Sequence, residues 1–124
     1  QYAYAQAMYE GNCAKEDRPA LEDALGACRA AVEAIMRTVN ETGEDAQAKS
    51  AALRRWAASL SELHALSGDV LDALSGDMKD VHKAYAQAFR FASSLRKHKL
   101  GDAESSLAQI LQNWAIAYLV RGMD

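Results

Sequence analysis

The sequence predicts an all-α protein, an antiparallel four-helix bundle with a short extra N-terminal helix, from its composition and its apolar spacing. The 124 residues include 26 alanines and 13 leucines, whereas valine, isoleucine and threonine together number only 10. Alanine and leucine favour helices, and a large sheet would need more β-branched residues. Apolar residues also recur every three or four positions, which is the spacing of one helix face. We expect bundle helices at about residues 18–40, 46–66, 69–99 and 102–121, in a single domain spanning residues 1–124.

Two helices are expected before residue 41. An apolar stripe within residues 2–14 predicts the short first helix. The next helix has a well-marked start, because Asp17 can cap it and Pro19 falls in its first turn. Its apolar residues then alternate steps of four and three, the spacing that keeps one seam facing a partner helix. They are Leu21, Leu25, Cys28, Val32, Ile35 and Val39.

Residues 46–99 carry a continuous apolar spacing that two copies of the string ALSGD interrupt, at 65–69 and 73–77. Either copy could end a helix at its glycine and cap the next helix with its aspartate. A break near residues 67–69 predicts helices at 46–66 and 69–99, which match the neighbouring helices in length. The alternative is an elongated bundle with one long helix over 46–99. Because each interior glycine costs a helix about 1 kcal/mol, we favour the break.

The last helix is expected to follow a basic helix end at Arg96–Lys99, with Gly101 terminating that end and Asp102 capping the new helix. Six apolar residues share its predicted buried face: Leu107, Ile110, Leu111, Trp114, Ala117 and Tyr118. Ile116, Leu119 and Val120 extend the apolar surface to other sides. The last helix is therefore predicted to be either central in the bundle or a contact site.

Charge and cysteine content narrow the classes of function. The net charge is −3 and the isoelectric point about 5.6, so no overall positive field attracts nucleic acid or an anionic membrane. No apolar run reaches the ~18 residues of a membrane span, and the first residues lack the pattern of a signal peptide. We therefore expect a soluble, cytoplasmic protein. Cys13 and Cys28 are too few for a disulfide framework, and we expect two reduced thiols.

No catalytic, metal-binding or cofactor-binding motif is evident. The Glu-x-x-His pairs of di-iron bundles are absent, because Ser61, Lys79 and Leu95 stand three residues before the three histidines. The cysteines have no histidine near them in sequence, and no glycine-rich phosphate loop follows a strand. The prediction is a non-enzymatic protein with no cofactor and no metal.

The leading functional hypothesis is a protein–protein interaction module, such as an adaptor, an assembly subunit or a chaperone-like bundle. It would bind a partner helix, or a second copy of itself, through apolar helix surface. The expected contact residues are Leu74, Val81, Tyr85, Ile116, Leu119 and Val120.

Two alternatives remain open at this stage. One is a ligand-binding or sensory bundle with a small-molecule pocket among Trp56, Tyr85 and Trp114. The other is an elongated coiled-coil dimer that serves as a scaffold, which requires the unbroken helix over 46–99.

Overall fold

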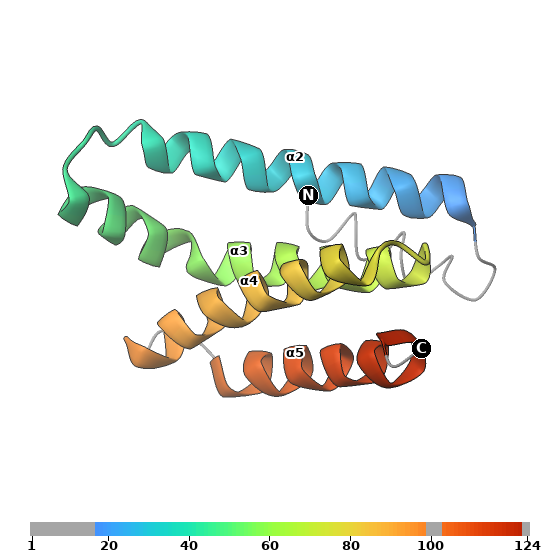
Figure 1. Ribbon diagram of the computed structural model, residues 1–124. Helices are drawn as coiled ribbons and strands as arrows, with labels where there is room; N and C mark the ends of the chain where they lie inside the picture. Colours follow the sequence, from blue (N-terminus) through green and yellow to red (C-terminus); the bar gives the residue numbers. More distant parts are fainter. Residues whose placement is uncertain (1–16, 99–102, 123–124) are drawn as a thin grey trace.

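The computed structural model describes residues 17–98 and 103–122, and nothing in this part of the chain is a β-strand. Consecutive helices run in opposite directions, so the predicted antiparallel four-helix bundle is confirmed (Figure 1). The helices are α2 (Arg18–Asn40), α3 (Ala46–Ala73), α4 (Met78–Lys97) and α5 (Ala103–Ala117), followed by a π-helical turn, η2 (Tyr118–Gly122). The helix expected within residues 2–14, Cys13, and the Gly101–Asp102 boundary lie outside the described residues.

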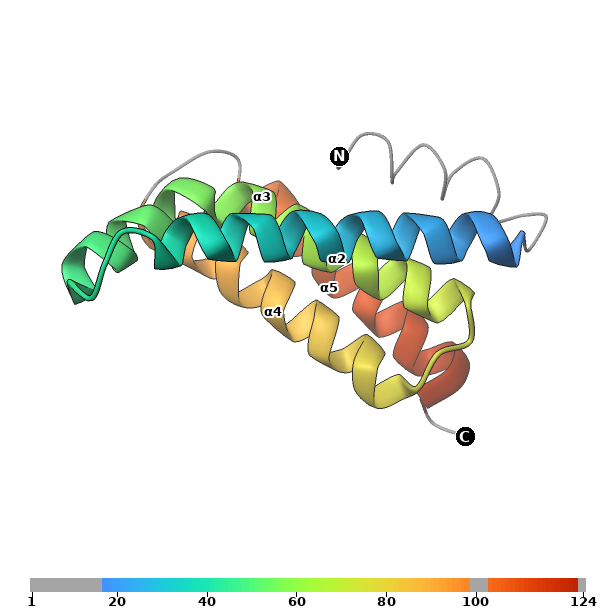
Figure 2. The ribbon, with the colours of Figure 1, turned by 90° about the horizontal axis from the view of Figure 1, so that it is seen from above.

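The helix α3 contacts each of the other three helices. It packs most extensively against α4, also along α2, and more lightly against α5, which rests mainly on α4. Figure 2 shows α2 lying over α3, with α4 and α5 on the far side. Buried residues of α2 and α3 form one core cluster, and buried residues of α4 and α5 form another. The molecule is thus built as successive antiparallel hairpins.

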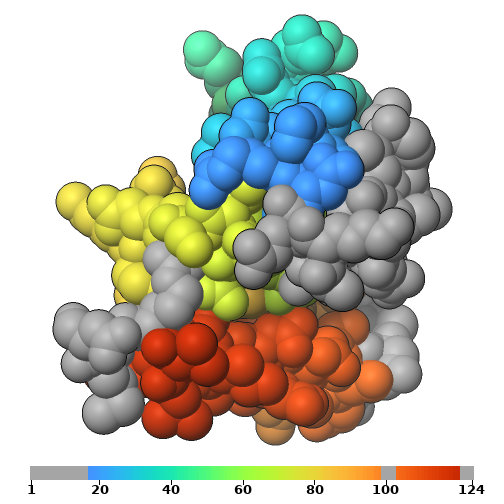
Figure 3. Space-filling model, turned by 90° about the vertical axis from the view of Figure 1, so that its right-hand side faces the viewer, coloured from blue at the N-terminus to red at the C-terminus, as the bar shows by residue number. Residues whose placement is uncertain are grey.

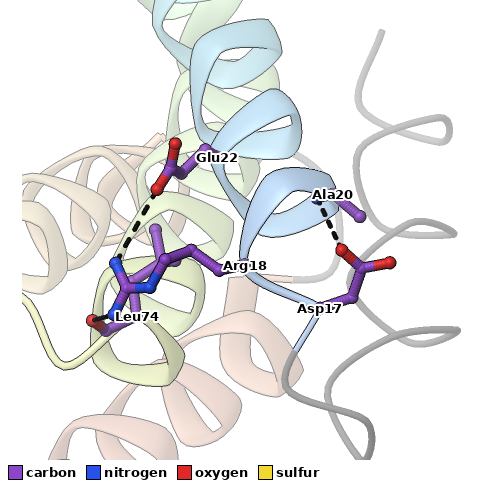
Figure 4. A network of polar contacts seen from close by, with 5 residues as sticks. All are labelled: Asp17, Arg18, Ala20, Glu22 and Leu74. Carbon is purple, nitrogen blue, oxygen red and sulfur yellow. Dashed lines mark hydrogen bonds and ion pairs between the residues drawn. The ribbon is translucent and has the colours of Figure 1, made fainter.

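The start of α2 is fixed by polar contacts that also tie it to the end of α3 (Figure 4). The Asp17 carboxylate accepts a hydrogen bond from the Ala20 N–H at 3.2 Å, as the sequence predicts for a capping residue. The Arg18 guanidinium donates to the Leu74 carbonyl at 3.0 Å, and lies 3.7 Å from the Glu22 carboxylate. Arg18 therefore supplies a donor to a carbonyl at the C-terminal end of α3, where helix carbonyls lack intrahelical partners.

The break that the sequence predicts between helices at 46–66 and 69–99 falls at the wrong copy of ALSGD. The helix continues through the first copy to Ala73, and the chain turns at the second. There Ser75 adopts a left-handed backbone conformation with φ 57°, and the Gly76 N–H donates to the Leu71 carbonyl at 2.8 Å. Asp77 then caps α4 by accepting from the Lys79 N–H at 2.9 Å. The unbroken helix over 46–99 is also wrong, since α3 and α4 fold back on each other.

The first ALSGD copy stays helical because its glycine makes room for an aromatic ring. A Cβ atom on Gly68 would lie 2.9 Å from two ring atoms of Tyr85, closer than side chains tolerate. Ser67 places its hydroxyl on the Leu63 carbonyl at 2.8 Å, inside the helix. Gly68 therefore serves helix packing between α3 and α4, and not helix termination.

Candidate interaction surface on the last helix

One stripe of α5 is buried against α4. Its residues Leu107, Ile110 and Ala117 join a core cluster with Val81 and other buried residues of α4. Trp114 packs on the edge of this cluster and lies against Tyr85, with ring centroids 6.1 Å apart. Apolar burial therefore holds α5 along one side only, and its other sides are not covered by this cluster.

A polar network holds α5 to α3 and α4 beside this stripe. The Tyr85 hydroxyl of α4 donates to the Asp69 carboxylate of α3. The Asn113 amide of α5 donates to the two oxygens of the same carboxylate at 3.3 and 3.4 Å, and accepts from Gln109 at 2.9 Å. Burial raises the pKa of Asp69 to about 6, the hydrogen bonds from Tyr85 and Asn113 oppose the rise, and the nearby charge of Asp72 adds to it.

A second anchor joins the end of α5 to the start of α4. The Trp114 indole N–H donates to Nδ1 of His82 at 2.8 Å, which satisfies a polar atom on a partly buried aromatic side chain. The His82 ring also lies 5.9 Å from the Tyr118 ring, centroid to centroid. These contacts fix the orientation of Trp114 and Tyr118, so the surface next to them is preorganised.

Five large apolar side chains on α5 and the π-helical turn η2 remain 47% to 67% exposed. We call them the α5 apolar surface: Leu111, Ile116, Tyr118, Leu119 and Val120. No charged residue occurs from residue 105 to residue 120, so the segment that carries this surface has no ionic side chain of its own. In Figure 3 the red end of α5 lies at the same end of the molecule as the blue start of α2.

A shallow apolar hollow of about 420 Å³ lies within this surface. Leu111, Trp114, Ala115 and Tyr118 line it together with His82 of α4. Leu111 and Tyr118 were expected on the buried face of the helix, and that expectation is wrong. They lie at the edge of the buried stripe, where α4 does not cover them.

The structure divides the predicted contact residues into two groups. Ile116, Leu119 and Val120 are exposed, as expected of a contact surface. Val81 and Tyr85 are only 0% and 1% exposed, because α5 and Gly68 cover them, so they do not offer a surface on the folded bundle.

Leu74 and Trp56 serve packing within the bundle. Leu74 is half-buried against the core cluster between α2 and α3. Trp56 packs with a third cluster around Leu60 and Phe91, whereas Tyr85 and Trp114 stack in the cluster of α4 and α5. The three residues predicted to line a ligand pocket, Trp56, Tyr85 and Trp114, do not come together, because Trp56 packs in a different core cluster from the other two.

A separate groove of about 380 Å³ runs between α2 and α4. Leu25, Val32 and Leu71 contribute apolar lining, and charged side chains from α2 and α4 stand around them. His64 also lines it, stacked on Phe91 with centroids 5.8 Å apart, and burial lowers the pKa of this imidazole. No sequence motif pointed to this groove, because its residues come from three helices.

Comparisons with known proteins do not assign this chain to a family. No protein family, no curated protein sequence and no solved structure matches the chain. Across residues 17–98 and 103–122, three or more histidine, cysteine or acidic side chains do not gather as a metal site would require. Within the same ranges, every helix is too short or too polar to cross a bilayer.

Proposed function

We propose that this protein is a non-enzymatic interaction module that binds an apolar helix of a partner protein through the α5 apolar surface. The observation that carries the proposal is the exposure of five large apolar side chains on one uncharged helix end. Contiguous exposed apolar surface of this kind typically marks an interaction site. The π-helical turn that carries Leu119 and Val120 supports the same assignment, since such turns occur frequently at functional sites.

The spacing of the exposed residues suits a helical partner. Leu119 and Val120 lie three and four positions after Ile116, which is the spacing by which residues share one side of a helix. Covering them would contribute about 1 to 2 kcal/mol each, since complete burial of such side chains is worth about 1.5 to 3 kcal/mol. The cost of association offsets part of this gain, so these three contacts by themselves support only weak affinity, in the millimolar range at best.

The absence of charge next to these residues indicates the chemistry of the partner. A helix rich in leucine or isoleucine, with few charges on its contact face, would lose little hydration free energy on binding. A strongly charged partner would find no opposite charge along residues 105–120. A second copy of this chain satisfies the same requirement and is one outcome of the test.

Site-specific photocrosslinking in cells tests the proposal. A photoreactive phenylalanine analogue at position 119 should crosslink to a protein, whereas the same analogue at the exposed position 108 of α5 should not. Leu119→Asp, combined with a crosslinker at position 116, should abolish the product, and Ala108→Asp should leave it unchanged. Equal crosslinking at positions 119 and 108 would refute the specific use of this surface.

The buried thiol fits a role without catalysis. Burial raises the pKa of Cys28, while a hydrogen bond with Ser67 opposes the rise, so the reactive thiolate is disfavoured.

A second candidate function, small-molecule binding, is favoured by the groove between α2 and α4. Native mass spectrometry of the purified chain separates the two, since a retained small ligand supports the second candidate and a protein complex supports the first.

A further inference from the structure

A basic hollow of about 220 Å³ lies between the first half of α3 and the last turns of α4. Its polar lining consists of Ser50, Arg54, Arg90, Ser94 and His98. Leu53 and Phe91 supply the apolar part of its wall. Because α4 and α5 are antiparallel, the end of α4 that lines this hollow lies at the opposite end of the molecule from the end of α5 (Figure 1).

The positive charge of this hollow is not neutralised by the protein. Among residues 17–98 and 103–122, no carboxylate lines the hollow, and neither Arg54 nor Arg90 forms an ion pair. Arg96 on the same helix provides the contrast, because its guanidinium lies 3.2 Å from the Glu104 carboxylate. The Arg90 guanidinium donates to the uncharged Gln87 amide at 3.5 Å, which leaves its positive charge unbalanced, and an anion between Arg54 and Arg90 would neutralise charge from both helices.

The buried ring of Phe91 positions one of these arginines. The Arg90 guanidinium carbon lies 5.5 Å from the centroid of the Phe91 ring, within the range of a cation–π interaction. His64 stacks on the same ring with only 7° between the two planes, so the ring is held in place. An arginine that is already oriented loses less conformational entropy when it binds a ligand.

We propose that this hollow binds the phosphate group of a small phosphate monoester. Guanidinium groups present their N–H donors in a fork that matches phosphate oxygens, and Arg54 and Arg90 would supply such forks from two different helices. The hydroxyls of Ser50 and Ser94 supply further donors. The organic part of the ligand would lie against Leu53 and Phe91. A bare phosphate ion has no apolar group to make this contact.

Calorimetric titration at low ionic strength, with phenyl phosphate and inorganic phosphate as probes, tests this site. Phenyl phosphate should bind saturably, with a dissociation constant of about 1 mM or below, and more tightly than inorganic phosphate. Arg54→Gln and Arg90→Gln should each weaken phenyl phosphate binding about tenfold, because each removes a charge-assisted contact. Arg55→Gln, which removes an exposed arginine that does not line the hollow, should leave the affinity unchanged.

Three results would overturn the proposal. The first is no saturable binding of either probe up to about 10 mM. The second is an equal loss of affinity in Arg54→Gln and Arg55→Gln, which would indicate diffuse attraction by surface charge. The third is inorganic phosphate binding as tightly as phenyl phosphate, which would exclude a role for the apolar wall. Arg54 and Arg90 are not core residues, so all variants are expected to fold, and circular dichroism verifies this.

Discussion

The carboxylate of Asp69 should make the stability of this bundle depend on pH in an unusual direction. Burial raises the pKa of Asp69 from 3.8 to about 6 in the folded protein. The folded state therefore binds the proton more tightly than the unfolded state does. The resulting stabilisation is fully present below about pH 4 and is lost as the pH rises through about 6. The size of the shift corresponds to about 3 kcal/mol, since one pKa unit is worth about 1.4 kcal/mol.

Urea denaturation of the wild type and of Asp69→Asn measures this contribution. The asparagine side chain has nearly the shape of the protonated acid, and it can still accept from Tyr85 and Asn113. The free energy of unfolding of Asp69→Asn, relative to the wild type, should therefore rise by about 2 to 3 kcal/mol between about pH 4 and about pH 7. Asp23→Asn, which removes an exposed carboxylate from α2, controls for the loss of one negative charge.

A difference between Asp69→Asn and the wild type that stays constant over this pH range would refute the reasoning. It would mean that hydrogen bonds from Tyr85 and Asn113 stabilise the charged carboxylate as well as water does. Tyr85→Phe separates the two contributions. Removing the hydroxyl donor should raise the pKa of Asp69 further, and NMR titration of the carboxyl carbon reports that pKa directly.

Three substitutions that add or remove a glycine test the packing and the turn. Gly68→Ala should lower the free energy of unfolding by about 1 to 3 kcal/mol, because its Cβ atom would lie 2.9 Å from the Tyr85 ring. Gly26→Ala in α2, where no atom beyond the local backbone of the helix lies within 4 Å of the added carbon, is the matched control and should stabilise the protein by about 1 kcal/mol. Ser75→Gly should stabilise it by about 0.5 to 1 kcal/mol, since a serine at φ 57° is strained. Urea denaturation checks all three, and a stable Gly68→Ala or a destabilised Ser75→Gly would contradict the structural explanation.

The sequence predicted part of the α5 apolar surface, but it did not predict which residues at the edge of that surface are exposed. Ile116, Leu119 and Val120 exceed what one buried stripe of a helix can hold, so helical spacing predicts either a central helix or a contact site, and the structure shows these side chains exposed. Leu111 and Tyr118 are large apolar residues like the buried ones, and their positions along the helix continue the same spacing. Only the width of the contact with α4 determines that they remain exposed.

The carboxylate network and the basic hollow gave no signal in the sequence. Asp69 was interpreted as a helix cap, because its local string is identical to the one that caps α4 at Asp77. Arg54 and Arg90 lie 36 positions apart in the chain, so only the pairing of α3 with α4 brings them to one hollow. Sites made by several helices depend on contacts that local spacing does not encode.

The amino-acid sequence by itself determined the helical class, the start of α2 at Asp17 and the apolar seams, because these depend on residue propensity and on contacts within one or two turns. Tertiary structure alone decided which copy of ALSGD ends a helix. Both copies carry the same local signals, but the Tyr85 ring occupies the space at Gly68 and the Tyr85 hydroxyl bonds Asp69. Those contacts keep the first copy helical, and the chain turns at the second.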